Sequence, residues 1–384
     1  MTRRDQRARI GVSVVFAVCG AAFATWAARV PEVQGQAGVD TGQLAVALFG
    51  LAAGSVVALA LSGSVIVKVG SRTGALSGAV LLCACLPLAA FAAGPASLTC
   101  VLFLLGAGNS LLDVSMNAHA ARVEAAYGRA VFAGFHAFWN VGGLVGAGAA
   151  AALAALRVPV SLHFAVAGAV LCGIGVVAVT TGFYTGPDHG QGGAALVLPG
   201  RALVPLGAIA FCGFLAEGTV NDWSAVYLTE VTGAPSGIAS LGYFAFSTAM
   251  IAVRLVADRV AGVSGAVVLM RVAAVVAATG FGVTVLAGEP VLGIIGFAVV
   301  GLGVSAIVPL AWSTAAKTCP ESPGQAISAV AACGYLGFLV GPVFIGGLAG
   351  AFGLSRALLA VVLFCAAVFA LAPAVRGHDR VRSE

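Results

Sequence analysis

The sequence has 384 residues, of which 60% are apolar and only 9% are charged, and its net charge is +5. Because an average soluble domain has about 25% charged residues, this composition excludes a cytosolic enzyme, a nucleic-acid-binding protein and a disordered chain. A membrane-crossing helix needs about 20 apolar residues, and helices of that length would occupy nearly the whole chain. The composition therefore indicates a polytopic membrane protein whose function resides among its helices.

Twelve apolar segments follow one another along the chain: 10–33, 43–67, 74–93, 98–121, 131–156, 160–183, 203–228, 237–258, 267–288, 291–316, 325–350 and 354–374. The longest connection, residues 184–202, contains a polar, glycine-rich breaker run. The sequence therefore predicts an all-α protein with twelve transmembrane helices in two pseudo-symmetric six-helix bundles. These bundles are residues 1–183 and 203–384, joined by a cytoplasmic linker.

Basic residues predict the orientation, because cytoplasmic loops are enriched in Lys and Arg. With the N-terminus inside, 15 of the 19 basic residues fall at cytoplasmic ends: Arg3, Arg4, Arg7, Arg9, Lys68, Arg72, Arg122, Arg129, Arg201, Arg259, Arg271, Lys317, Arg376, Arg380 and Arg382. Both termini are therefore expected in the cytoplasm of a protein of the cytoplasmic membrane. The net positive charge then reflects topology and does not indicate an anionic partner.

The two halves of the chain share a weak repeat. Lys68 and Arg259 end equivalent segments 191 residues apart, and the Gly-x-x-x-Gly motifs that begin at Gly142 and Gly337 are 195 residues apart. Trp26 and Trp223 extend the pattern at a spacing of 197 residues. Parallel six-helix repeats with a site at their interface are typical of many secondary transporters, so the spacing indicates an internal duplication.

Short motifs along the whole chain resemble those of the major facilitator superfamily. They are Trp26-Ala-Ala-Arg29-Val-Pro31, Asp113-Val-Ser-Met-Asn117-Ala, Phe135-His136-Ala and Glu217-Gly218-x-x-Asn221-Asp222-Trp223-Ser. Within the superfamily the sequence is most similar to the YbjJ-like branch, which is distantly similar to fucose–proton symporters. The loop after residue 67 departs from the superfamily's usual Gly-x-x-x-Asp-Arg pattern, since Val67 and Lys68 replace the acid and the arginine.

The fourth apolar segment carries a polar face. Asn109, Asp113 and Asn117 are spaced four residues apart, so they lie on one side of a helix. His136 and Asn140 have the same spacing on the next segment and fall at similar depths, where a histidine can exchange protons with a carboxylic acid. The resemblance implies that Asp113 takes part in proton coupling, with His136 as its partner. The alternative is a hydrogen-bond network that only holds the two helices together.

Five more charged residues fall in apolar segments of the second half or near the outer end of the first segment. Glu217, near the bilayer midplane and on one face with Asn221, is a second candidate for binding a proton or the solute. Arg29 and Asp222 fall at similar outer depths, which predicts either a gating ion pair or two side chains that reach the interface separately. Arg254 precedes Asp258 by one helical turn, so it either pairs with that acid or binds an anionic part of the solute.

Aromatic side chains divide into two groups. Trp26 and Trp223 are expected at the membrane interface, where Trp is enriched. Trp139, Trp312 and Tyr335 are candidates for stacking on a bound solute, and the amides of Asn109, Asn117, Asn140 and Asn221 are candidates for hydrogen bonds to it.

These features predict a secondary active transporter that works by alternating access. The resemblance favours proton-coupled uptake of a small polar organic solute such as a sugar; the alternative is a proton-driven antiporter that exports drugs or metabolites. The sequence has neither a His-Glu-x-x-His motif nor a Gly-x-x-x-x-Gly-Lys loop. We therefore expect no catalytic residues, metal or cofactor, and no nucleic-acid partner. The expected partners are a solute, protons and the lipid bilayer, and the expected state is a monomer.

Overall fold

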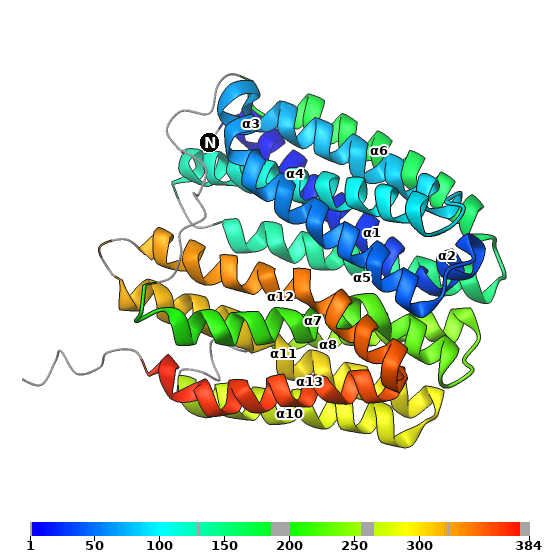
Figure 1. Ribbon diagram of the computed structural model, residues 1–384. Helices are drawn as coiled ribbons and strands as arrows, with labels where there is room; N and C mark the ends of the chain where they lie inside the picture. The colour runs from blue at the N-terminus through cyan, green and yellow to red at the C-terminus, as the bar shows by residue number, and fades with distance from the viewer. Residues whose placement is uncertain are drawn as a thin grey trace, which may run out of the picture. The chain divides into compact units, whose positions relative to one another are not determined.

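A computed structural model describes residues 2–128, 131–185, 200–254, 265–319, 321 and 323–376. Over this part of the chain the secondary structure consists of helices joined by short loops (Figure 1). The helices are α1 (Arg3–Ala27), α2 (Val30–Ala37), α3 (Thr41–Ala90), α4 (Pro95–Tyr127), α5 (Phe132–Ala155), α6 (Val160–Gly182), α7 (Val204–Glu230), α8 (Ser236–Arg254), α10 (Ala266–Ala287), α11 (Pro290–Thr318), α12 (Pro323–Phe352), α13 (Leu354–Leu371) and η1 (Ala372–Val375). Eleven helices of the described part are long and apolar enough to cross a membrane.

Several helices begin at residues that satisfy or remove the free N–H groups of the first turn. Asp40 accepts a hydrogen bond from the backbone N–H of Gln43 at 2.8 Å, and the Gln43 side chain accepts one from the backbone of Asp40 at 3.1 Å. Such a reciprocal capping box stabilises the start of α3. Pro95, Pro205 and Pro290 occupy the first turns of α4, α7 and α11, where the missing proline N–H costs no hydrogen bond.

Helix α3 contains two of the predicted membrane spans. At Gly70 the backbone leaves the helical region, with φ 84° and ψ 155°, a conformation that only glycine adopts without strain. Contacts with α4 show that the chain reverses at this break. Before it, α3 runs parallel to α4, with Gly50 against Thr99 and Gly54 against Phe103. After it, α3 runs antiparallel to α4, with Gly74 against Ser115 and Gly78 against Leu112. The fifty residues of α3 are therefore two antiparallel spans.

The first predicted span, 10–33, is not one helix. It begins earlier, at Arg3, and is broken after Ala27. The cause is Pro31, because a proline within a helix clashes with the carbonyl group four residues before it, here that of Ala27. Arg29 lies in the break with φ −120° and ψ 16°, and α2 starts at Val30. The prediction that Arg29 lies within a helix is therefore wrong.

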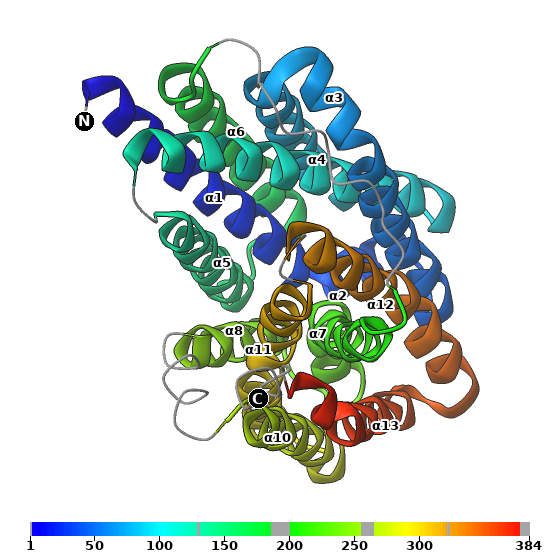
Figure 2. The same cartoon turned by 90° about the vertical axis from the view of Figure 1, so that its left-hand side faces the viewer.

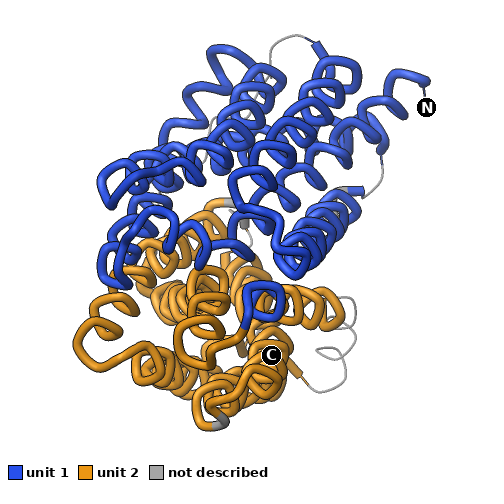
Figure 3. The backbone as a smooth tube through the Cα atoms, turned by 90° about the vertical axis from the view of Figure 1, so that its right-hand side faces the viewer, with its two compact units in different colours: residues 1–193, 235–240 blue, residues 194–234, 241–384 orange. Residues whose placement is uncertain are grey.

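The described residues form two compact units (Figure 3). The first comprises residues 1–193 and 235–240, and the second comprises residues 194–234 and 241–384. Within the first unit α1 packs against α5 and α6, and α3 packs against α4 and α6. Within the second, α7 packs against α12, and α10 packs against α11 and α13 (Figure 2). Most of the predicted linker, residues 186–199, lies outside the described residues, and the predicted bundle boundaries stay a prediction.

Small residues bring α1 close to its neighbours. A Cβ added to Gly142 of α5 would fall on the carbonyl oxygen of Ala17, and one added to Gly20 of α1 would fall on that of Trp139. Against α6, a Cβ added to Gly11 would lie 2.9 Å from the Cα atom of Gly182, which is closer than real Cβ atoms approach. Because lipid supplies no hydrophobic drive between helices, such close backbone approach is a main source of helix association in membranes.

His119 joins three segments at the end of the first unit where α4 and α6 finish. Its Nδ1 lies 2.8 Å from the Ser71 hydroxyl, its Nε2 accepts a hydrogen bond from the Tyr184 backbone N–H at 2.9 Å, and Phe183 stacks on its ring at 4.0 Å. The Tyr184 hydroxyl donates to Asp5 of α1 at 3.0 Å. Burial, together with this hydrogen bond, raises the pKa of Tyr184 to about 12, so the phenol keeps its donor proton.

Candidate functional site

The polar face of α4 is present as the spacing indicated. Asn117 donates hydrogen bonds from its Nδ2 to the Asp113 carboxylate at 3.1 Å and to the Asp113 carbonyl oxygen at 2.8 Å. One turn before Asp113, the side-chain oxygen of Asn109 accepts a hydrogen bond from the Cys19 thiol at 3.5 Å. All three α4 side chains are half-buried. They form a polar row along successive turns of α4.

Helices α1 and α5 add two residues to this row. Cys19 of α1 is buried, lies near enough to Asp113 for an electrostatic interaction, and hydrogen-bonds with the Trp139 side chain. The structure thus brings the predicted residues Asn109, Asp113 and Trp139 together around one thiol. Sequence reasoning missed Cys19, because a cysteine in an apolar segment looks like any small apolar residue. Only the glycine-mediated approach of α1 to α5 places it at the site.

His136 and Asn140 extend from α5 in the same unit. His136 is exposed, and its ring packs edge-on against Phe16 of α1, with the centroids 5.1 Å apart. Asn140 is half-buried one turn further along the helix. A proton exchange between His136 and Asp113 stays a prediction.

Glu217 is the central residue of α7, thirteen residues from either end, or about 20 Å at the usual helical rise. Its carboxylate interacts electrostatically with Arg254 of α8. Tyr243 of α8 lies within the electrostatic reach of Glu217, Asp222 and Arg254 and hydrogen-bonds with Ser247. No spacing in the sequence joins Arg254 to Glu217 or selects Tyr243. Asp258, the other predicted partner of Arg254, lies outside the described residues.

Trp312 and Tyr335, two of the predicted solute-stacking residues, both pack against Phe214, which the sequence analysis did not select. Phe214 of α7 stacks on Tyr335 of α12 at 5.8 Å with an interplanar angle of 12°, and its ring lies 6.1 Å from that of Trp312 of α11. The Trp312 indole nitrogen has no hydrogen-bond partner within the part of the chain that the structure describes. Asn221 is half-buried on α7, one turn beyond Glu217.

Arg29 has partners within its own unit. Its Nε lies 2.8 Å from the Glu32 carboxylate, its Nη2 donates to the Val158 carbonyl oxygen at 3.0 Å, and its Nη1 lies 3.4 Å from His163 Nδ1. The Nε–H does not point at the carboxylate, so this contact is an ion pair without an aligned hydrogen bond. Glu32 also hydrogen-bonds with Ser236. Asp222 belongs to the second unit, and its pairing with Arg29 stays a prediction.

Trp26 and Trp223 do not mark a membrane interface. Both indole rings are almost fully buried inside the protein, at 1% and 0% exposure, and Trp26 packs against Phe164 of α6 at 6.5 Å. Interfacial tryptophans face lipid and water, so this expectation is wrong. A tryptophan near a helix end has the same sequence pattern whether its neighbour is lipid or another helix. Among the described residues, no group of three His, Cys, Asp or Glu side chains is arranged to hold a metal ion.

Comparisons with known proteins agree with this architecture. Residues 11–342 match the Major Facilitator Superfamily. The chain is 34% identical to the uncharacterized transporter y4wD of Sinorhizobium fredii over 95% of its own length and 97% of that protein. It is similar in fold to a mutant form of the nucleoside transporter NupG, with a TM-score of 0.78 and 14% identity over 95% and 98% of the two chains. The corresponding values for a D-xylose–proton symporter are 0.73 and 14% over 96% and 98%.

Proposed function

The chain belongs to the major facilitator superfamily of membrane transporters, and we propose that it is a secondary active transporter that moves a small polar organic solute together with protons. The observation that carries the proposal is a carboxyl group in the middle of a membrane-spanning helix in each unit, Asp113 in α4 and Glu217 in α7. An ionisable group at such depth is costly and marks a transport or proton pathway by default.

The surroundings of the two acids assign them different roles. Asp113 receives a hydrogen bond from the neutral amide of Asn117, and within the described chain its carboxylate has no cation at ion-pair distance. A proton is then the means of removing its charge during transport, so we assign proton binding to Asp113. Arg254 acts electrostatically on Glu217 but lies beyond ion-pair distance of it among the described residues. We therefore assign a second proton site to Glu217, which Arg254 would neutralise only in a state in which the two side chains approach each other. His136 is the proposed relay to Asp113.

The solute would be held by aromatic faces and amides. In the second unit Trp312 and Tyr335 pack around Phe214, and the indole N–H of Trp312 is free to donate among the described residues. In the first unit Trp139 hydrogen-bonds with Cys19, whose thiol also bonds to the Asn109 side chain. Asn117 lies two turns beyond Asn109 on α4, and Asn140 follows Trp139 on α5. Asn221 lies beside Glu217. Flat apolar faces combined with hydrogen-bonding groups suit a sugar-like solute, which is the class that the name of the xylose–proton symporter also suggests.

Gating would involve the break between α1 and α2. Ser240, one turn after the start of α8, donates a hydrogen bond to the Ala28 carbonyl oxygen at 2.7 Å, and Ser236 bonds to Glu32. Arg29 holds Glu32 in place. We propose that these contacts form in one state of an alternating-access cycle and break in the other. Asp222, Arg254 and Asp258 are the other charged residues to which we assign a gating role.

The remaining predicted features belong to the same proposal. Both termini lie in the cytoplasm, since the basic residues gather at that side, and the protein is a monomer of the cytoplasmic membrane. The two six-helix bundles, residues 1–183 and 203–384, would rock about a site near the bilayer midplane.

The test is transport by the purified protein in proteoliposomes, with a panel of radiolabelled monosaccharides and nucleosides. One proton per neutral solute supports about tenfold accumulation across one pH unit. Asp113→Asn keeps the acceptor for Asn117 and removes the proton site, so we expect accumulation to disappear while exchange of labelled for unlabelled solute continues. The matched control is Asp40→Asn, because Asn caps a helix as well as Asp. Accumulation by Asp113→Asn equal to that of the original protein would refute the assignment.

The direction of proton movement separates symport from the antiport alternative. When solute is added outside vesicles without a gradient, symport carries protons inward and makes the medium more alkaline. Antiport makes the medium more acidic. An acid shift would overturn the proposed symport in favour of export driven by protons.

A further inference from the structure

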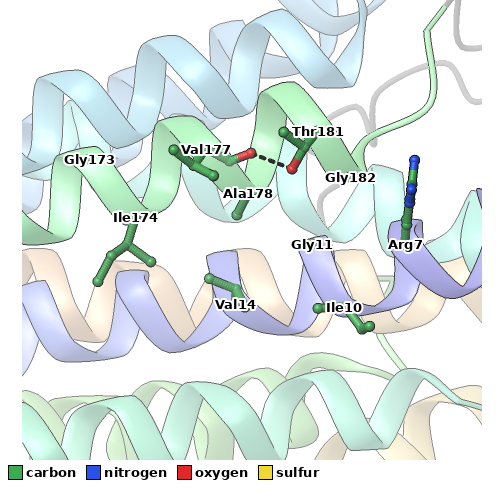
Figure 4. Close-up of a pocket in the computed structure, with 10 residues that line it drawn as sticks. All are labelled: Arg7, Ile10, Gly11, Val14, Gly173, Ile174, Val177, Ala178, Thr181 and Gly182. Atoms are coloured by element: carbon green, nitrogen blue, oxygen red, sulfur yellow. Dashed lines mark hydrogen bonds between the residues drawn. The ribbon is translucent and has the colours of Figure 1, made fainter.

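A groove runs between α1 and α6 on the surface of the first unit (Figure 4). It has a volume of about 730 Å³ and is lined by Arg7, Ile10, Gly11, Val14, Gly173, Ile174, Val177, Ala178, Thr181 and Gly182. This volume lies within the range of about 300–1,000 Å³ typical of small-molecule sites. None of the residues assigned to transport above lines it, so the groove needs a separate explanation.

The floor of the groove is formed by small residues and its walls by exposed apolar side chains. Gly11, Ala178 and Gly182 are buried where the two helices meet. Ile10 and Val177, at 64% and 60% exposure, rise beside them. On membrane-spanning helices such exposed apolar side chains face lipid, so an occupant of the groove would be predominantly apolar and would come from the bilayer.

The positively charged side chain of Arg7 lies at one end of the groove. Figure 4 shows Arg7 beside Gly182, at the opposite end from Gly173 and Ile174. Arg3 precedes Arg7 by one turn, so both guanidinium groups lie on one face of α1, and both residues are exposed. No acidic side chain of the described residues lies within ion-pair distance of Arg7. The groove therefore joins an apolar channel to an uncompensated positive charge.

The length of the groove matches one leaflet of a bilayer. Gly173 and Gly182 are nine residues apart, which is about 13.5 Å of helix, and half of a hydrocarbon core is about 15 Å. A chain that starts at Arg7 would run from the headgroup level nearly to the midplane. We propose that the groove is a binding site for an anionic phospholipid, with its phosphate at Arg7 and Arg3 and one acyl chain between α1 and α6.

A substitution at Gly173 can block the groove without disturbing the packing of α1 against α6. A Cβ added at Gly173 would have no atom within 4 Å, and the residue is exposed. Gly173→Phe therefore places a large side chain in the groove without disturbing the contact between the helices. Gly347 of α12 is equally exposed and open and does not line the groove, so Gly347→Phe is the matched control.

The experiment is a lipid titration of the purified protein by native mass spectrometry, with dioleoyl phosphatidylglycerol and dioleoyl phosphatidylcholine. We expect tighter binding of the anionic lipid. Arg7→Gln should weaken phosphatidylglycerol binding about fivefold, equivalent to about 1 kcal/mol for one basic residue at the membrane surface, and should leave phosphatidylcholine unchanged. Arg356→Gln, an exposed charge away from the groove, is the control. Gly173→Phe should abolish the strongest site for both lipids.

Three results would overturn the proposal: equal binding of the two lipids by the original protein, unchanged phosphatidylglycerol binding by Gly173→Phe, or the same loss in Arg356→Gln as in Arg7→Gln. Each variant is first compared with the original protein by size-exclusion chromatography and thermal unfolding. Because Arg3→Gln tests the same headgroup contact independently, a folding defect of Arg7→Gln would leave the proposal testable.

Discussion

Arg29 at the break between α1 and α2 should contribute strongly to stability. The side chain is only 3% exposed and Glu32 only 17%. Replacing Arg29 by Met removes the ion pair and the hydrogen bond to the Val158 carbonyl oxygen, and it leaves the Glu32 carboxylate largely buried without a cation. Breaking a buried pair in this way typically costs about 3–5 kcal/mol. Because the pair lacks an aligned hydrogen bond, we expect the lower end, about 3 kcal/mol.

Glu32→Gln should cost less than Arg29→Met. Arg29 keeps its bond to Val158 and its contact with His163, and the Gln side chain can still bond to Ser236. The expected loss is about 1–2 kcal/mol. In the double variant the uncompensated carboxylate is absent, so its loss should be smaller than the sum of the two single losses by at least about 1 kcal/mol.

The assay is reversible unfolding of the purified protein in mixed micelles with increasing fractions of sodium dodecyl sulfate, followed by circular dichroism. The four proteins of the cycle are compared at one protein concentration. Losses that simply add, or a loss of less than about 1 kcal/mol for Arg29→Met, would refute the reasoning that this pair is a buried, coupled unit.

Two further predictions concern packing and the end of the first unit. Gly142→Ala should lower the free energy of unfolding by about 1–3 kcal/mol, because its Cβ falls on the Ala17 carbonyl oxygen, whereas Gly347→Ala has open space and should be neutral; equal thermal unfolding midpoints for the two variants would contradict the close contact of α1 with α5. His119→Ala leaves the half-buried Tyr184 N–H without its acceptor and should cost about 1 kcal/mol. Replacement by Gln, which can still accept, should cost less in the same unfolding measurement, and equal losses would show that the hydrogen bond contributes nothing.

Much of the fold follows from local sequence. The apolar segments are long enough to cross a membrane, and in lipid the backbone must satisfy its own hydrogen bonds, which leaves helices as the solution. The common face of Asn109, Asp113 and Asn117 also follows locally, because the helical period places residues four apart on one side. Even the break after Ala27 has a local cause in Pro31, although the length of the apolar run concealed it.

The rest of the candidate site depends on which helices meet. Cys19 joins Asn109 and Trp139 only because glycines let α1 and α5 approach closely. Phe214 joins Trp312 to Tyr335 across three helices. Neither relation has a spacing that could reveal it in the sequence.

Hydrophobicity and the rise of a helix are local properties. The amino-acid sequence was therefore enough to predict that the apolar segments are helices and that Asp113 and Glu217 lie near the middle of theirs. The partners of those residues emerged only from the folded chain: Glu32 for Arg29, Arg254 for Glu217, and protein in place of lipid around Trp26 and Trp223. The physical reason is that helix association in a membrane rests on shape and small residues. These features set contacts between distant segments and leave no periodic signal along the chain.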